Sequence, residues 1–337
     1  MITVEQQIKV ITGIKPDQIP DEVYQSPVPL VLKGIAADWP IVKAGLESRE
    51  AVKDYLLRFY RGQEVAAFLG KPENHGRVFY DEKLTGFNYD TVTAKLDFAL
   101  DQLLANAGNP TPPTIYIGST SVDTYLPGFR AENDLAITRD NPLISIWISN
   151  KCRIAAHWDS PLNIACSVVG RRRFTLFPFE QMENLYVGPL EKTPAGQAIS
   201  LVDFYNPDFE KYPKFREAIK HAQIAELEPG DGIFIPSMWW HHVESLDALN
   251  ILVNYWLLDI PPWFGKPVNA LYHAMLSLRG LSDEQRAAWK QIFDYYIFDY
   301  KPENFSHIPR EAQGALGELT DDEARKLRAR LLSQLNR

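Results

Sequence analysis

The sequence predicts a mainly β protein with flanking helices. Short apolar runs separated by turn residues recur through the middle of the 337-residue chain, at 143–148, 153–156, 163–169, 173–177, 232–236 and 251–257. The 24 prolines fit many short strands and turns better than long helices, because proline interrupts the hydrogen bonding of a helix interior. Downstream of Trp256, helix-start signals replace this strand rhythm.

Residues 1–110 alternate helix and strand signals and are expected to form an α/β flank that is integral to the β core. Helical spacing through Val52, Tyr55 and Leu56 follows Ser48, which is a plausible N-cap. The expected elements are a weak helix at Val4–Ile11, a strand at Pro29–Lys33, a helix at Ser48–Phe59, strands at Glu64–Leu69 and Gly76–Tyr80, and a helix at Asp90–Ala107.

Residues 111–260 are expected to form the β core. Its first strand contains Tyr116, and residues 178–222 interrupt the strand rhythm with four prolines between Gly188 and Ala222 and one short helix at Phe215–His221. So long a connection inside a compact domain is usually a functional segment or a cover. Its aromatic residues either shape access to a site or pack against the core.

A candidate metal site begins at the end of one strand. His157 and Asp159 are two residues apart, so an extended backbone turns both side chains to the same face. The alternative is a hydrogen-bonded pair at a strand end. A downstream segment, Pro229–Trp256, favours the metal site because it supplies His241 and His242.

Only one of these two histidines can join the site, because adjacent residues of a strand face opposite sides. The residues alone leave open which one it is. Either choice yields two histidines and one carboxylate on one face of a metal, a ligand set that suits Fe(II) because it keeps coordination positions open.

Residues 261–337 are expected to be helical. Helices are predicted at Asn269–Leu278, at Ser282–Tyr296 behind a capping box of Ser282 and Gln285, and after a second box of Thr320 and Glu323. The second of these helices is expected to bury Ala288, Trp289, Ile292, Phe293 and Tyr296. The last carries an apolar stripe, at Ala324, Leu327, Leu331 and Leu335, which needs cover from its own domain or from a second copy.

Composition excludes several classes of protein. A net charge of −8 and an estimated pI of about 5.5 provide no general attraction to nucleic acid or to anionic membranes. No apolar run approaches the roughly 18 residues of a membrane span, and the first residues lack the pattern of a signal peptide. The two cysteines, Cys152 and Cys166, are read as buried free thiols, which suits a cytoplasmic protein.

Taken together, these motifs resemble the Jumonji-C family of Fe(II)- and 2-oxoglutarate-dependent oxygenases. The resemblance is greatest to its cupin-like branch, which includes the asparaginyl hydroxylase that inhibits the hypoxia-inducible factor. It runs from about Pro27 to Trp256 and rests on His157, Asp159, Trp239-Trp240-His241-His242-Val243-Glu244-Ser245 and Val253-Asn254-Tyr255-Trp256. It implies a double-stranded β-helix (a jelly roll), with His241 as the third metal ligand and His242 in a supporting role.

The resemblance also implies a 2-oxoglutarate site formed by Tyr116, Asn163, Arg172 and Asn254. This chain departs from the family pattern at two positions, with Arg172 where a lysine is common and Ile154 where a threonine is frequent. Arginine is no simple replacement for lysine, because its planar fork grips a carboxylate differently. The strand that begins near Arg171 is expected to turn at least one of Arg171, Arg172 and Arg173 inward.

The function implied by the resemblance is a dioxygenase that uses Fe(II), 2-oxoglutarate and O2 to hydroxylate a protein side chain or a small molecule. Two alternatives remain: a metal-dependent cupin enzyme that does not use 2-oxoglutarate, and a non-catalytic binding or regulatory module. The resemblance further implies a homodimer formed through the C-terminal helices.

Overall fold

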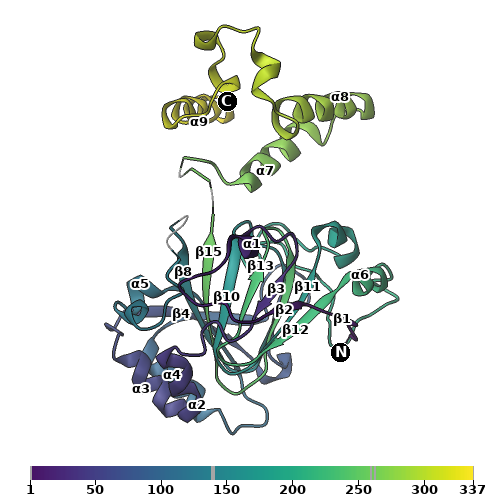
Figure 1. Ribbon diagram of the computed structural model, residues 1–337. Coiled ribbons are helices and arrows are strands. Elements are labelled where there is room, and N and C mark those ends of the chain that lie inside the picture. Colours follow the sequence, from purple (N-terminus) through teal and green to yellow (C-terminus); the bar gives the residue numbers. More distant parts are fainter. Residues whose placement is uncertain (1, 138–140, 259, 262, 337) are drawn as a thin grey trace. The chain divides into compact units, whose positions relative to one another are not determined.

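A computed structural model describes residues 2–137, 141–258, 260–261 and 263–336 of the chain (Figure 1). The chain divides into two compact units, Met1–Leu258 and Asp259–Arg337, which are described separately below. The first unit contains all of the strands found in the described residues, and the second is helical.

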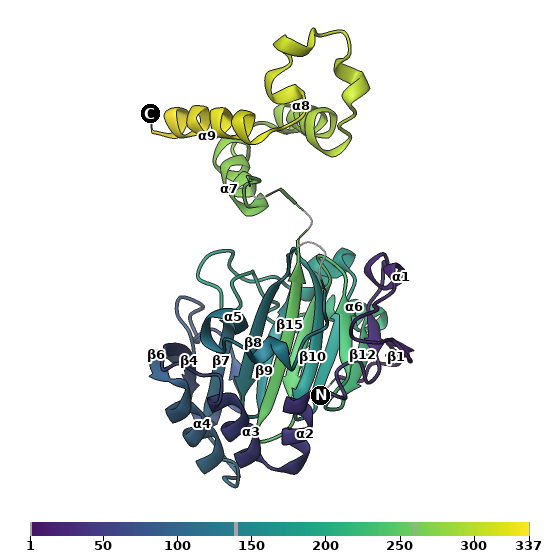
Figure 2. The ribbon, with the colours of Figure 1, turned by 60° about the vertical axis from the view of Figure 1, so that its left-hand side comes forward.

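Two facing sheets form the centre of the first unit (Figures 1 and 2). In the described residues, the smaller sheet has six strands in the order β1 (Gln6–Gln7), β12 (Gln223–Leu227), β11 (Arg172–Phe177), β14 (Trp240–Ser245), β9 (Cys152–His157) and β5 (Arg77–Val78). The larger has nine, in the order β2 (Lys9–Ile11), β3 (Leu30–Leu32), β13 (Gly232–Ile235), β10 (Leu162–Val169), β15 (Asn250–Leu257), β8 (Leu143–Ser149), β7 (Thr114–Ser121), β4 (Glu64–Gly70) and β6 (Tyr89–Lys95).

Successive strands alternate between the two sheets. From β8 to β11, and again from β12 to β15, consecutive strands change sheets, so each sheet is assembled from segments far apart in the chain. This alternation is the mark of a jelly roll. The predicted double-stranded β-helix with flanking helices is confirmed.

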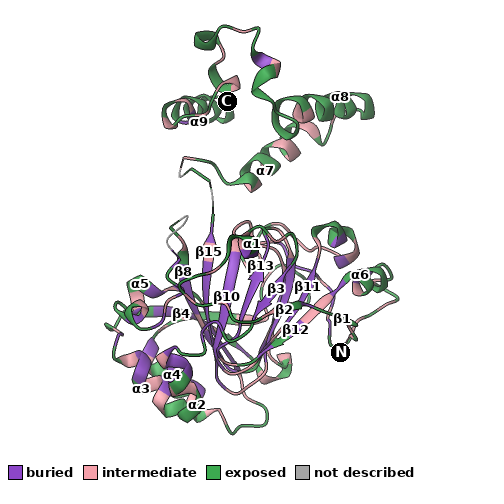
Figure 3. Ribbon diagram, in the orientation of Figure 1, coloured by how far each residue is buried: buried purple, intermediate pink, exposed green. Residues whose placement is uncertain are grey.

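The core has two main layers (Figure 3). One lies between the sheets and includes Tyr116, Phe174 and Leu252. The other covers the outer face of the nine-stranded sheet with three helices, α2 (Pro40–Glu47), α3 (Arg49–Leu57) and α4 (Leu96–Ala105). Ser48 caps α3 as predicted, because its side chain accepts a hydrogen bond from Ala51 N at 3.0 Å.

Two predicted helices of the N-terminal flank are wrong wholly or in part. Val4–Ile11 is not helical, because β1 and β2 pair in parallel with β12 and β3. Asp90–Lys95 belongs to strand β6, which pairs with β4, and only the remainder forms helix α4. Tertiary pairing overrides weak helical periodicity at both places, and the β-branched residues Thr91, Val92 and Thr93 suit a strand.

Other predictions for this flank agree with the structure. The strand at Pro29–Lys33 is β3, that at Glu64–Leu69 is β4, and the short helix of the insertion is α6 (Phe215–His221). The strand predicted at Gly76–Tyr80 is reduced to the two residues of β5. Phe79 and Tyr80 are buried against each other, with ring centroids 5.4 Å apart, as a packed pair.

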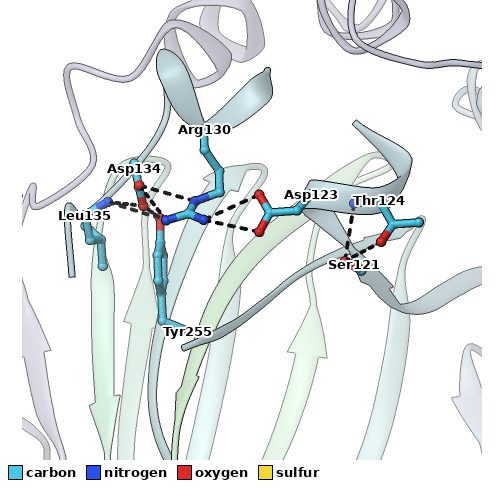
Figure 4. A network of polar contacts seen from close by, with 7 residues as sticks. All are labelled: Ser121, Asp123, Thr124, Arg130, Asp134, Leu135 and Tyr255. Carbon is cyan, nitrogen blue, oxygen red and sulfur yellow. Dashed lines mark hydrogen bonds and ion pairs between the residues drawn. The ribbon is translucent and has the colours of Figure 1, made fainter. Parts of the chain in front are cut away.

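A polar network fastens strand β15 at the end nearest α5 (Val122–Tyr125) (Figure 4). The buried Tyr255 hydroxyl donates to Asp134 Oδ1 at 2.8 Å and accepts from the backbone N–H of Leu135 at 3.1 Å. Arg130 joins Asp134 to Asp123. Since Tyr255 lies between Asn254 and Trp256, this network fixes a strand whose other side chains reach the candidate site.

The second unit contains helices α7 (Pro267–Leu278), α8 (Asp283–Phe293) and α9 (Asp321–Leu335). The predicted capping box of Ser282 and Gln285 starts α8, and the Thr320 side chain accepts from Glu323 N at the start of α9. The predicted burial of the α8 stripe is wrong. Trp289, Ile292 and Tyr296 are 41–46% exposed.

Of the α9 stripe only Ala324 is buried, and Leu327, Leu331 and Leu335 are exposed. Within the described residues, no helix combines the length and the apolar character that crossing a membrane requires.

Candidate metal centre

Two neighbouring strands bring the predicted ligands together. β9 pairs antiparallel with β14 so that His157 lies directly opposite His241. Asp159 follows two residues after His157, and its Oδ2 lies 3.5 Å from His241 Nε2. One potential ligand atom from each of the three residues lies within 4.8 Å of those of the other two. The arrangement therefore forms a compact face of two imidazoles and one carboxylate.

Each imidazole is oriented by its own backbone. His157 Nδ1 lies 2.9 Å from the carbonyl oxygen of Ala155, and His241 Nδ1 lies 3.0 Å from that of Trp239. A carbonyl oxygen can only accept, so Nδ1 carries the proton in both rings. The Nε2 lone pairs are therefore left for a metal. Histidines that bind a metal through one ring nitrogen usually donate the N–H of the other nitrogen in this way.

The protonation states of the site suit a cation. Burial lowers the pKa of His157 to about 4, with a further contribution from His241, so His157 is neutral at pH 7. Burial alone would raise the pKa of Asp159, but its hydrogen bond with His241 and the nearby histidine charges outweigh that effect and lower it. Two imidazole nitrogens and an ionised carboxylate form a donor set that fits Fe(II).

The neighbouring His242 lies on the opposite face of β14. Its ring stacks on Phe204 of the insertion at a centroid distance of 4.5 Å. Burial lowers the pKa of His242 to about 3, so this residue is a neutral packing group. Strand alternation thus separates the two adjacent histidines, and the register with β9 brings His241 to Asp159.

All seven predicted site residues line one small cavity between the sheets, of about 70 Å³. Besides the three potential ligands, these are Tyr116 on β7, Asn163 on β10, Arg172 on β11 and Asn254 on β15. The cavity is completed by Trp147, Ile154, Ala165, Phe174, Ala195, Val243, Leu252 and Trp256.

Arg172 is a buried cation. It is 2% exposed, and its Nε and Nη2 atoms have no hydrogen-bond partner among the described residues. Burial lowers the pKa of Arg172. An unpaired buried charge is costly, which indicates that the site is built to receive an anion.

The flanking arginines behave differently. Arg171 forms ion pairs with Asp247 and Glu226, and Arg173 pairs with Glu226 and Glu244. The prediction that at least one arginine of this run points inward is confirmed, and the residue is Arg172.

The two asparagines of the cavity are connected. Asn254 Nδ2 donates to Asn163 Oδ1 at 3.2 Å, and the indole N–H of Trp147 donates to Asn254 Oδ1 at 2.7 Å. These bonds hold both amides at the wall of the cavity opposite the smaller sheet, since β10, β15 and β8 are adjacent strands of the larger one.

Several residues of the cavity wall, among them Trp147, Trp256 and Ala195, were not predicted as site residues from the sequence. Trp147 and Trp256 lie in predicted strands. The alternation of side chains along a strand could have predicted that they point into the cavity, as Asn254 does. Ala195 comes from the insertion, for which sequence periodicity gives no orientation. Its presence in the cavity wall agrees with the expectation that the insertion lies near the site.

Comparison with known proteins supports the resemblance to the cupin-like branch of the Jumonji-C family. The sequence model of a family described as "Cupin-like domain" matches residues 16–260. The chain is 37% identical to human HSPB1-associated protein 1 over 117 residues, which are 34% of this chain and 23% of that protein. It is 33% identical to lysine-specific demethylase JMJ31 of Arabidopsis thaliana over 114 residues, 34% of this chain and 20% of the demethylase.

A longer match, 25% identical over 238 residues, covers 65% of this chain and 49% of JmjC domain-containing protein D of Dictyostelium discoideum. The chain thus spans less than half of the length of each of these relatives. None of the three is described as an asparaginyl hydroxylase, so placement in that branch stays a prediction. The family match, the jelly roll and the compact His-Asp-His face lead to one conclusion: the chain belongs to the cupin-like, Jumonji-C family.

Proposed function

We propose that this protein is an Fe(II)- and 2-oxoglutarate-dependent dioxygenase that hydroxylates a protein side chain or a small molecule. The observation that carries the proposal is one cavity that contains both a potential metal face and a buried, unpaired arginine. A metal face alone fits many metalloproteins, and a buried arginine alone fits many anion sites. Their combination fits a cosubstrate with a metal-chelating end and a carboxylate at the other end.

Each residue has a defined task in this proposal. His157, Asp159 and His241 hold the metal through two imidazole nitrogens and one carboxylate. The Arg172 guanidinium, with Tyr116 beside it, binds the distal carboxylate in place of the lysine that is common in the family. Asn163 and Asn254 orient the chelating end, and the apolar wall around them excludes water. Bound iron would supply the centre at which O2 is activated, with 2-oxoglutarate providing two electrons as it becomes succinate and CO2.

A protein substrate is favoured by the names of the relatives. One is described as a protein associated with HSPB1 and another as a lysine-specific demethylase. A small-molecule substrate remains the alternative, and the negative net charge disfavours nucleic acid as a general partner.

The first experiment is an anaerobic titration of the Fe(II)-loaded protein with 2-oxoglutarate. A visible metal-to-ligand charge-transfer band that is absent from Asp159→Ala is the expected result. If iron is bound and no band forms, 2-oxoglutarate does not chelate it and the proposal is wrong.

A second candidate function is a cupin-type metal enzyme that does not use 2-oxoglutarate. The observation in its favour is the pair of departures at Ile154 and Arg172, both of which line the cavity. Calorimetry with a series of dicarboxylates and 2-oxoacids separates the candidates, since this second one predicts no preference for 2-oxoglutarate. The third reading, a non-catalytic module, predicts that His157→Ala retains the partner binding and the cellular role of the wild type.

We also propose a homodimer formed by the C-terminal helices. The exposed stripe of α8, with Trp289 and Ile292 at 42% and 41% exposure, is apolar surface that a second copy would cover. Light scattering should give the mass of a dimer for the wild type and of a monomer for Ile292→Glu. Gln291→Glu adds a negative charge at the next residue along the helix and should leave the dimer intact. Equal masses for all three proteins would contradict this proposal.

A cytoplasmic location is proposed as well, because Cys152 and Cys166 are both free and buried. Fractionation of cells that produce a tagged protein would test it, and recovery from an oxidising compartment would contradict it.

A further inference from the structure

Seven aromatic rings form a continuous chain from the candidate metal cavity to the surface. Consecutive ring centroids are 4.5–6.2 Å apart, which is the range of direct aromatic contact. We call this set the aromatic chain; its members in order are Trp256, Trp147, Tyr116, Phe68, Tyr89, Phe87 and Tyr80.

The inner end of the aromatic chain touches the candidate metal site. Trp256, Trp147 and Tyr116 all line the cavity that contains the three potential ligands. Trp256 lies in the wall of this cavity together with Asp159. The Trp256 and Trp147 centroids are 5.7 Å apart, so the two indoles continue from the cavity wall into the protein.

The outer end reaches a groove that is separate from the metal cavity. Tyr89, Phe87 and Tyr80 line this groove, which has a volume of about 1000 Å³, and Phe87 is 36% exposed. Tyr89 belongs to β6, the last strand of the nine-stranded sheet. Its ring stacks on Phe68 at 4.5 Å and on Phe87 at 5.0 Å, with planes nearly parallel.

Packing alone explains part of this arrangement. Several of these rings belong to the core between the sheets, where aromatic contacts add stability. Packing does not require oxidisable side chains, however, and leucine or phenylalanine would fill the same space. Five of the seven rings are tryptophan or tyrosine, the two side chains that give up one electron most readily.

We propose that the aromatic chain is an electron relay that protects the metal site when oxygen is activated without a substrate. This inference rests on the proposed oxygenase function, because the relay needs an oxidant formed at the metal from O2. The groove would then also be the place where a small reductant meets the protein.

Electrons and protons balance along the relay. An oxidant formed at a bound metal would take one electron from Trp256 or Trp147, and the electron vacancy would pass across Tyr116 and Phe68, which keep their protons, to Tyr89. Tyr89 loses one electron and releases its phenolic proton to water in the groove, which leaves a neutral tyrosyl radical. A thiol or ascorbate-type reductant then returns one electron and one proton, which restores tyrosine.

The test exposes Fe(II)-loaded protein to 2-oxoglutarate and O2 without substrate, in the presence of a nitroso spin trap, and maps the products by mass spectrometry. We expect trap adducts on Tyr89 or Tyr80 in the wild type. In Tyr89→Phe the adduct on that residue disappears, and oxygen addition to Trp147 and Trp256 rises several-fold. The phenylalanine retains the stacking and removes the oxidisable phenol.

Two further variants separate the relay from packing and from exposure. Phe68→Leu breaks the chain between Tyr116 and Tyr89, and it should reduce the Tyr89 adduct although that tyrosine is still present. Tyr212→Phe is the matched control, because Tyr212 lines the same groove but packs edge-to-face against Tyr186, which is not a member of the aromatic chain. Equal tryptophan oxidation in the wild type, Tyr89→Phe and Tyr212→Phe would overturn the relay.

A metal-free measurement keeps this inference distinguishable from the proposed function. Azide radicals generated by pulse radiolysis oxidise tryptophan, and the transfer of the radical to tyrosine is followed by its absorbance. Tyr89→Phe should lower the yield of tyrosyl radical and Tyr212→Phe should not; equal yields overturn the relay. Oxygen uptake without an adduct on Tyr89 or Tyr80 removes the relay alone, whereas absence of oxygen uptake by iron-loaded protein removes the oxygenase proposal.

Discussion

His157 and His241 lie directly opposite each other on strands β9 and β14, with ring centroids 4.3 Å apart. This relationship joins two sequence segments more than eighty residues apart into one potential metal face. It also explains why the two adjacent histidines differ: the residue opposite His157 points inward, and its neighbour His242 points outward against Phe204.

Metal binding should therefore depend on one histidine of the pair. His241→Ala is expected to weaken Fe(II) binding by more than the roughly 10- to 100-fold that loss of an outer partner of a metal site costs. His242→Asn removes a ring that contacts no potential ligand atom and should change the affinity by less than about tenfold. Competition with a metal-chelating dye measures both, and equal losses would contradict the assignment.

Arg172 should control the binding of the cosubstrate without affecting the metal. Arg172→Met removes the buried positive charge and keeps a long, unbranched side chain. We expect 2-oxoglutarate to bind at least about 30-fold more weakly, since losing one partner of a buried charge pair costs about 2–5 kcal/mol. Arg173→Met is the matched control, because Arg173 pairs with Glu226 outside the cavity. Anaerobic calorimetry on the Mn(II)-loaded proteins gives the affinities. Unchanged binding in Arg172→Met would mean that another group holds the distal carboxylate.

The stability of the metal-free protein should fall as the pH decreases from about 6.5 toward about 4. The pKa of His157 is lowered to about 4 and that of His242 to about 3, both chiefly by burial. In this range the two histidines bind protons in the unfolded chain but not in the folded protein. The free energy of unfolding therefore decreases, as the pH falls, by at most about 1.4 kcal/mol per pH unit for each histidine.

Urea unfolding at a series of pH values above about 5 measures this slope, since carboxylates with ordinary pKa values near 4 contribute little there. His242→Asn removes one of the two titrating groups and should flatten the slope. A free energy of unfolding that is independent of pH in the wild type would show that these histidines do not stay neutral in the folded protein.

Gly170 should be needed for the turn between β10 and β11, which carry Asn163 and Arg172. Its φ is +70°, and an added Cβ would lie 2.5 Å from both Leu249 O and Asn250 Oδ1. We expect Gly170→Ala to lower the free energy of unfolding by on the order of 3 kcal/mol, from backbone strain and the clash together.

Gly196→Ala separates these two contributions. Gly196 has a φ of +80° but nothing within 4 Å of an added Cβ, so only the backbone strain of about 1 kcal/mol applies. Urea unfolding of both variants measures the difference. Equal losses of stability would show that the loop at Leu249 moves away at little cost.

Local sequence patterns predicted much of the β core because each segment carries its own signal. The apolar runs around Ile146, Ile164 and Val253 became β8, β10 and β15, and the cap at Ser48 started α3 as expected. Predictions failed where the signal was weak and a partner strand decided the conformation. Val4–Ile11 and Asp90–Lys95 have some helical spacing, but pairing with β3, β12 and β4 makes them strands.

The sequence by itself determined which residues are candidates for the site. The two-residue spacing of His157 and Asp159, the histidine pair and the family motifs brought forward seven of the fifteen residues that line the cavity. Those patterns are local and depend on the alternation of side chains along a strand.

Only the tertiary structure decided how these residues meet. The register of β14 against β9 selects His241 over His242 on geometric grounds. The packing of the two sheets buries Arg172 and leaves its Nε and Nη2 without a hydrogen-bond partner among the described residues. Register and burial depend on contacts between segments far apart in the chain, and no local pattern contains them. For the same reason, the aromatic chain from Trp256 to Tyr80 could be recognised only after folding had placed five separate segments side by side.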